Sequence, residues 1–197
     1  MYGLYIHIPF CVRKCVYCDF YSLPTETGPV SQRLKTQTTI SQSKFLDALE
    51  CELSLLPIEF RPTTLFLGGG TPTELSLNDF TRLMNMIHRH VDLSALKEWT
   101  CEANPGTLQP PLVHAMRNAG INRVSLGVQS FQDHTLEQLG RIHSGEEAIR
   151  GYHMLREYGF KNINIDLIFG TPGTSHGDLE EDLSNLLSLR PEHAAAY

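Results

Sequence analysis

Strand-like and helix-like segments alternate along this chain of 197 residues. Short runs rich in β-branched and aromatic residues predict strands over 4–8, 64–68, 98–103, 123–128, 162–170 and 193–197. Longer stretches with apolar residues at helical spacing predict helices over 45–56, 77–90, 112–120, 146–159 and 179–189. Gly120 and Gly159 stand at the ends of two of these helices, where C-cap glycines are common. The alternation predicts an α/β fold with a parallel sheet, either a barrel or a doubly wound sheet.

The composition predicts one domain and narrows the classes of partner. With 41% hydrophobic and 19% charged residues, the chain has enough apolar material for one sizeable core. The 22 acidic and 16 basic residues give a net charge of −6, which disfavours electrostatic binding to nucleic acid. No apolar run approaches the roughly 20 residues of a transmembrane helix, and no secretory signal pattern is present. We therefore expect a cytoplasmic protein with no transmembrane segment.

Two segments depart from the regular alternation. Residues 23–43 are rich in Thr, Ser, Gln, Gly and Pro without periodicity, which predicts a flexible surface loop. The chain stops at Tyr197, inside the sixth predicted strand, with no helix after it. We interpret this as truncation in or near the sixth strand, so that residues 1–197 form the N-terminal domain of a longer protein.

Three of the five cysteines lie within eight residues, directly after the first predicted strand. Cys11, Cys15 and Cys18 are four and three positions apart, so one loop can wrap their thiolates around an inorganic centre. Iron-sulfur clusters are held by such thiolates. Three cysteines on a [4Fe-4S] cluster leave one iron open to a small molecule, by the logic that leaves catalytic zinc one exchangeable position. An open coordination position on one iron implies that a small molecule binds and reacts there.

The cysteines also admit simpler interpretations. A zinc site completed by His7 is the alternative to a cluster, although the spacing is not that of paired zinc motifs. Cys51 lies in a predicted helix and Cys101 in a predicted strand, and both are expected to be small buried hydrophobes without a role. An odd number of cysteines, three of them crowded together, fits a metal centre in a reducing compartment better than disulfides.

Polar and glycine-rich residues follow each of the first five predicted strands at the same end. They are the cysteine loop, GGGTPT at 68–73, EANP at 102–105, GVQS at 127–130, and Asp166 with GTPG at 170–173. In a parallel barrel, functional groups collect at the carboxyl ends of the strands. Ordinary turns explain the glycines but not Glu102, Gln129 and Asp166, because polar and charged groups beside apolar strand ends need partners. The triple glycine would let backbone N–H groups approach a ligand, although it lacks the spacing of known phosphate-binding loops.

Motifs spread from Tyr5 to Gly173 resemble one family. They are YIHIPFC at 5–11, the C-x3-C-x2-C triplet, GGGTPT at 68–73, EANPGT at 102–107, NRVSLGVQSF at 122–131, LGRIH at 139–143 and NIDLIFGTPG at 164–173. Together they are similar to the oxygen-independent coproporphyrinogen III oxidase group of radical S-adenosylmethionine proteins. The resemblance implies a partial (β/α)6 TIM-like barrel. It also implies that the open iron of a [4Fe-4S] cluster binds S-adenosylmethionine, which one electron cleaves to a 5'-deoxyadenosyl radical.

The family's cofactor site carries over onto matching positions of this chain. The resemblance implies that Cys11, Cys15 and Cys18 ligate the cluster. It also implies that S-adenosylmethionine contacts Tyr5, Gly69, Gly70, Thr71, Glu102, Gln129, Arg141 and Asp166. Arg141 can pair with a carboxylate in a bidentate fork, while Glu102 or Asp166 can accept from ribose hydroxyls or an amino group. Without the resemblance, Arg141 would be interpreted as a solvated cation and Asp166 as a helix N-cap partner. His7 and His143 are expected to be packed or exposed.

The family contains oxidases, which decarboxylate coproporphyrinogen III, and haem chaperones, which bind haem and transfer it to recipient haemoproteins. The oxidases carry a fourth cysteine two residues after the third, where this chain has Phe20, and a long arm before the first cysteine, where it has ten residues. We therefore expect a haem chaperone, with haem or porphyrin as cargo and a reductant such as flavodoxin or ferredoxin, and an oxidase as the alternative.

Two further alternatives are weaker. A methyltransferase or haem-degrading relative would need a distinct C-terminal region, and the family's C-terminal domain is expected to be absent here. A bare electron-carrying iron-sulfur module would not need cofactor-binding residues at five strand ends.

Overall fold

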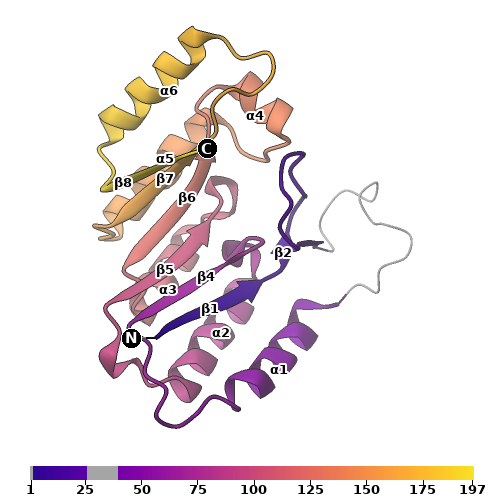
Figure 1. Cartoon of the computed structure of the whole chain (residues 1–197), viewed down its shortest axis with the longest axis vertical. Helices are drawn as coiled ribbons and strands as arrows, with labels where there is room; N and C mark the ends of the chain where they lie inside the picture. Colours follow the sequence, from indigo (N-terminus) through magenta and orange to yellow (C-terminus); the bar gives the residue numbers. More distant parts are fainter. Residues whose placement is uncertain (1, 26–39) are drawn as a thin grey trace.

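The computed structural model describes residues 2–25 and 40–197 and is built on one six-stranded parallel sheet (Figure 1). The strands, in their order across the sheet, are β1 (Gly3–Ile8), β4 (Thr64–Gly69), β5 (Glu98–Ala103), β6 (Arg123–Gln129), β7 (Ile163–Leu167) and β8 (His193–Ala196). Every neighbouring pair is parallel. β1 and β8 form the two edges, so the described strands make an open, partial barrel, as the family resemblance implies.

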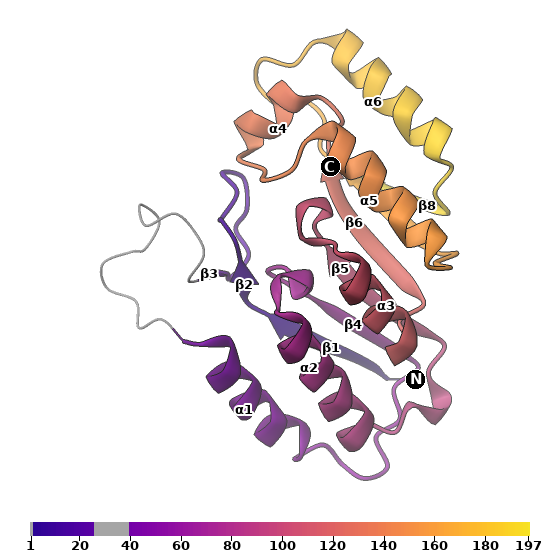
Figure 2. The same ribbon diagram turned by 180° about the vertical axis from the view of Figure 1, so that it is seen from behind.

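Helices connect the strands and cover one face of the sheet. They are α1 (Gln42–Leu53), α2 (Leu77–His90), α3 (Pro110–Ala119), α4 (Asp133–Leu139), α5 (Gly145–Glu157) and α6 (His176–Leu189), with short 3-10 turns η2 (Pro72–Glu74), η3 (Leu93–Ala95) and η4 (Pro105–Thr107). Helices α2, α3 and α5 lie in front of the strands in Figure 2 and behind them in Figure 1. The inner face of the sheet is therefore the one turned toward the viewer in Figure 1.

Side chains alternate between the two faces of each strand, and the two faces differ in chemistry. On the helix side, Trp99 and Cys101 of β5 and Leu126 of β6 are buried in the core. Glu102 and Ser125 alternate with them and lie on the inner face. Because a shift of one residue would exchange the two sets, burial of the apolar set fixes the register and gathers polar groups on the inner face.

Helix ends follow the signals in the sequence. The Ser76 side chain accepts the backbone N–H of Asp79 and caps α2, as a short hydroxyl side chain does at an N-terminus. Gly120 ends α3 with a left-handed φ of 102°. At the end of α5, the capping residue is Tyr158, and Gly159 follows it with φ 83°. Both glycines therefore supply the left-handed turn that a helix C-terminus favours.

Several predicted boundaries are wrong by a few residues. The strand predicted over 162–170 ends at Leu167, and the chain then turns at Gly170 with a φ of 71°. The helix predicted over 45–56 begins at Gln42, where the Ser41 side chain caps it, and ends at Leu53. Helix α4 and a short parallel pair, β2 (Phe10–Cys11) with β3 (Leu23–Pro24), were not predicted, because both are too short to show a period.

The two cysteines outside the triplet differ in exposure. Cys51 is exposed rather than buried, because α1 buries Leu46, Leu49 and Leu53, and Cys51 lies on the opposite side of that helix. Cys101 is buried, as predicted.

The loop predicted over 23–43 lies mostly outside the described residues, and its described ends include β3 and the first turn of α1. Among the helices of the described ranges, none combines the length and hydropathy of a transmembrane span.

Candidate functional site

A cavity of about 700 Å³ opens at the carboxyl ends of the strands. Its walls come from the cysteine loop after β2 and from the ends of β4, β5, β6 and β7. The predicted site residues that line it are Cys11, Cys15, Cys18, Gly69, Gly70, Thr71, Glu102, Gln129, Arg141 and Asp166. The fold thus brings together side chains that lie up to 155 positions apart in sequence (166 − 11).

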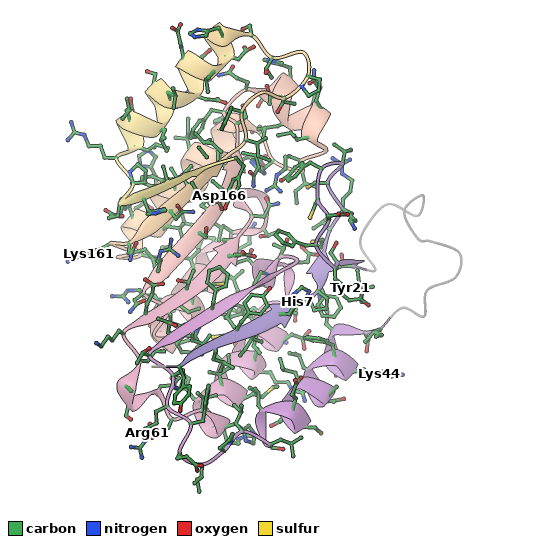
Figure 3. All side chains as sticks on the ribbon, in the orientation of Figure 1. His7, Tyr21, Lys44, Arg61, Lys161 and Asp166 are labelled. Carbon is green, nitrogen blue, oxygen red and sulfur yellow. The ribbon has the colours of Figure 1, made fainter. Side chains whose placement is uncertain are left out.

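Tyr5 is the one predicted site residue that does not line the cavity. It is 55% exposed on the inner face, and its hydroxyl lies 3.1 Å from Nδ1 of His7. His7 Nε2 in turn lies 2.9 Å from the carbonyl oxygen of Tyr21, which accepts its proton. Figure 3 shows His7 and Tyr21 close together beside the cysteine loop. Both ring nitrogens of His7 are therefore occupied by protein partners, which weakens the zinc interpretation.

The cysteine loop is clamped to the segment that follows α4. The Arg13 guanidinium donates to the carbonyl oxygens of Gly140, at 2.9 and 3.1 Å, and of Arg141, at 2.9 Å. The Val16 N–H donates to the Leu139 carbonyl at 3.3 Å. Two carbonyls at the end of a helix would otherwise lack partners, so Arg13 satisfies them while it fixes the loop.

The three cysteines of the loop are free and partly buried. Cys11 Sγ lies 3.5 Å from Thr71 Oγ1, and Cys15 Sγ accepts from Arg141 Nη1 at 3.4 Å. Within residues 2–25 and 40–197, no three His, Cys, Asp or Glu side chains are arranged to hold a single metal ion. In an iron-sulfur cluster each thiolate binds its own iron, so the sulfurs need not meet at one point. Burial raises the pKa of the Cys11 thiol, so metal binding there must release a proton.

Arg141 carries one donor that the protein leaves unused. Its Nη2 donates to the Gly127 carbonyl at 2.7 Å, and its Nη1 lies 3.4 Å from the Tyr17 hydroxyl. Its Nε is buried and has no hydrogen-bond partner in the described part of the chain. A buried donor without a partner costs free energy. The guanidinium as a whole lines the cavity, and its positive charge suits that wall to an anionic group of a ligand.

Glu102 and Asp166 are the two acids of the cavity, and their surroundings differ. Glu102 Oε2 accepts the Gly69 N–H at 3.0 Å. Burial raises the Glu102 pKa to about 7; the Gly69 N–H opposes this rise and the nearby Asp166 charge adds to it. Asp166 accepts from Ser125 at 3.1 Å and from Asn164 at 2.8 Å. Burial raises its pKa too, while these two hydrogen bonds lower it.

The glycines after β4 act differently from the prediction. Their N–H groups do not approach a ligand, because Gly69 donates to Glu102 and Gly70 donates to the Ile8 carbonyl at 2.8 Å. A Cβ at Gly70 would lie 2.6 Å from the Phe10 carbonyl oxygen. Gly70 is needed because the chain that leaves β1 passes directly over it on its way into the cysteine loop.

The sequence missed other residues of the cavity wall. They include Arg13, Tyr17, Asn104, Thr107, Ser125, Ile168 and Tyr197. Ser125 could have been found, because it alternates with Gly127 and Gln129 along one strand face. Gln129 itself has a φ of 70°, an uncommon backbone conformation for a residue with a side chain, at an irregularity in the β6–β7 pairing. His143 is buried between Asn104 and Val128, and is therefore packed, as expected.

Comparison with known protein families and curated proteins identifies the family of this chain. The model of the radical SAM superfamily matches residues 5–186. The chain is 39% identical over 201 residues to "Heme chaperone HemW" of Bacillus subtilis (strain 168), covering 100% of this chain and 50% of that protein. It is 37% identical over 195 residues to the protein of the same name in Escherichia coli (strain K12), covering 99% and 50%. The chain spans about half the length of these curated relatives.

Solved structures resemble the fold over nearly the whole chain. Coproporphyrinogen III oxidase (HemN) from Escherichia coli superposes with a TM-score of 0.84 at 30% identity, covering 99% of this chain and 44% of that one. The radical S-adenosylmethionine methyltransferase TsrM from Kitasatospora setae gives a TM-score of 0.67 at 16% identity, covering 98% and 35%. The second likeness concerns the fold alone.

Proposed function

The chain belongs to the radical SAM superfamily, and we propose that it is the cluster- and cofactor-binding part of a haem chaperone. Membership of the superfamily implies a [4Fe-4S] cluster and S-adenosylmethionine, which supply one-electron, radical chemistry when bound. The observation that carries the proposal is the convergence of three free cysteines, two acids and an arginine on one cavity.

In this proposal each side chain of the cavity has a role that fits its surroundings. Cys11, Cys15 and Cys18 hold the cluster on the loop that Arg13 clamps. Arg141 directs its guanidinium to the carboxylate of S-adenosylmethionine. Glu102 and Asp166 accept from its amino group or ribose hydroxyls, and Gln129, Gly69, Gly70 and Thr71 complete the wall. Tyr5 remains a predicted contact, and it would have to reach the cofactor from outside the cavity wall.

The choice of a chaperone over an oxidase rests on two observations. Curated relatives that are 34–39% identical to this chain are named heme chaperones. The position expected to hold a fourth cysteine in the oxidases is Phe20, which lines the cavity mouth and is 68% exposed. The likeness to the oxidase structure keeps coproporphyrinogen decarboxylation as the second candidate.

A haem chaperone needs a cargo, recipient proteins, a source of electrons and a reducing compartment. Haem is the cargo, haemoproteins are its recipients, and a small redox protein such as flavodoxin or ferredoxin supplies electrons. Thiolates that bind a cluster must stay reduced, which fits a reducing compartment such as the cytoplasm. Residues 1–197 form the N-terminal radical SAM domain, and haem transfer would involve the further length that the curated relatives possess.

The test uses the full-length protein, anaerobically reconstituted and supplied with S-adenosylmethionine and a reductant. Coproporphyrinogen III is added to one sample, and haem is titrated into another. We expect stoichiometric haem binding without protoporphyrinogen formation. Decarboxylation of coproporphyrinogen III would establish the oxidase instead. The absence of both haem binding and decarboxylation would contradict both functions and leave only the binding of the cluster and S-adenosylmethionine.

Glu102 gives a prediction that links pH to stability. A carboxyl with a pKa of about 7 in the folded protein and 4.5 in the unfolded chain binds more protons when folded. Stability from this group is therefore present below pH 4.5 and is lost as the pH rises through about 7. Glu102→Gln should raise the free energy of unfolding at pH 8 by about 2 kcal/mol and weaken S-adenosylmethionine binding. Denaturant unfolding across this pH range measures the first effect, and an unchanged pH dependence would contradict it.

A further inference from the structure

Three polar side chains stand side by side on the inner face of the sheet, next to Asp166. Ser125 of β6 pairs with Asn164 of β7, and Asn164 pairs with His193 of β8. Register partners on adjacent strands point to the same face, so these side chains form a row across three strands. Asp166 is two residues after Asn164 on that face, and Figure 3 shows it on the inner side of the sheet.

The hydrogen bonds of this row run in one direction. Asn164 Nδ2 lies 2.8 Å from Asp166 Oδ1 and 2.8 Å from Ser125 Oγ. An ionised carboxylate only accepts, so the atom facing it must be the amide nitrogen, which fixes the orientation of Asn164. The amide oxygen then faces His193 Nδ1 at 2.5 Å and accepts its proton. The Ser125 hydroxyl donates its single proton to Asp166 Oδ2 at 3.1 Å.

From this arrangement we propose that Asn164 is a positioning residue that aims the Asp166 carboxylate at the bound cofactor. His193 fixes the Asn164 amide from the edge strand, and Ser125 holds the second carboxylate oxygen. The inference rests on the proposed cofactor site, because it assigns the group that supports one of its acids.

Two side chains of this row, Asn164 and Ser125, are buried. Asn164 is 3% exposed and Ser125 is 8% exposed, so neither can be replaced by water without a rearrangement. Both protons of the Asn164 amide are used, one on each neighbour. Glu102 has less support, since its hydrogen-bond partner within residues 2–25 and 40–197 is the single backbone N–H of Gly69. The two acids of the cavity therefore differ: Asp166 is held in one orientation from both sides, and Glu102 from one.

The test is a double-mutant cycle on the anaerobically reconstituted full-length protein. Asn164→Ala and Asp166→Ala are made singly and together, and S-adenosylmethionine affinity is measured by calorimetry. We expect Asn164→Ala to weaken binding about tenfold in the wild-type background, since the hydrogen bond that Asp166 loses is to a charged carboxylate. In the Asp166→Ala background the same change should have no further effect, because a residue that acts through Asp166 has nothing left to position. A purely structural role would give equal losses in both backgrounds.

Matched variants keep the outcome clear. Asn118→Ala removes an exposed asparagine of α3 and should leave affinity unchanged. If Asn164→Ala does not fold, Ser125→Ala removes the other donor to Asp166 with little change in volume and should show the same coupling at a smaller loss. Iron content reports the cluster in every variant and should stay constant. Wild-type protein that fails to bind S-adenosylmethionine would overturn the proposed function, whereas normal binding with additive losses would overturn only the role of Asn164.

Discussion

Replacing Cys11, Cys15 or Cys18 by Ala in the full-length protein is expected to abolish the anaerobically reconstituted [4Fe-4S] cluster. The three thiols line one cavity, on a loop that Arg13 and the Val16 N–H tie to the segment after α4. In the proposed site each thiolate would ligate a separate iron, so the loss of any one would leave an iron without a protein ligand. Iron and sulfide content and the visible absorbance of the cluster measure the effect, and we expect near-complete loss for each variant.

The other two cysteines provide the control for this prediction. Cys51 is exposed on the far side of α1, so Cys51→Ala should retain the cluster and the stability of the parent. Cys101 is buried on the helix side of β5, so Cys101→Ala should retain the cluster at a cost of about 1 kcal/mol in stability. Similar loss of iron from all five variants would show that the triplet has no special role.

Gly145→Ala is expected to destabilise the protein by more than about 3 kcal/mol, the largest effect on folding that we predict. A Cβ at Gly145 would lie 2.1 Å from the carbonyl oxygen of Phe131 and 2.8 Å from its carbonyl carbon. The Phe131 backbone cannot move away easily, because its N–H donates to the buried Asp182 carboxylate at 2.7 Å. The start of α5 must shift instead, and Arg141 lies only four residues upstream. Denaturant unfolding measures the loss, and S-adenosylmethionine binding should fall with it.

Gly177→Ala is the matched control, since Gly177 also lies in the first turn of a helix that a serine caps. The nearest atom to a Cβ there is Ser175 Oγ at 3.6 Å, which is ordinary contact. Alanine has the higher helix propensity, so this change should be neutral or stabilising by up to about 1 kcal/mol. Equal stability of the two variants would refute the steric argument at Gly145.

Much of the candidate site could be predicted because its residues lie within short local motifs. The cysteine spacing, the acid at the end of β5 and the acid of β7 are visible in the printed sequence. Parallel strands joined by helices all end at one edge, so residues at strand ends are expected to meet there. This rule correctly brings Glu102, Gln129 and Asp166 to one cavity. It could not place Tyr5, because a residue in the middle of a strand can face the cavity or stand apart from it.

The hydrogen bonds that hold the cysteine loop against the segment after α4 could not be predicted, because they join backbone groups that are distant in the sequence. Arg13 binds carbonyls 127 and 128 positions further along the chain, and any loop could have presented such carbonyls. The N–H groups of the triple glycine were expected to face a ligand, but they are used inside the protein. Cys51 was expected to be buried, since its type favours the core, but the phase of α1 decides its exposure.

The sequence by itself determined the α/β class, the parallel sheet and the family, because periodicity and local motifs depend only on residues that are close in the chain. Tertiary structure alone decided which donors remain free and which are used. The spare Nε of Arg141 and the row from His193 through Asn164 to Asp166 exist only because separate strands stand in one register. Hydrogen bonds depend on distances of a few tenths of an ångström, and such distances between remote residues are set by packing of the whole core.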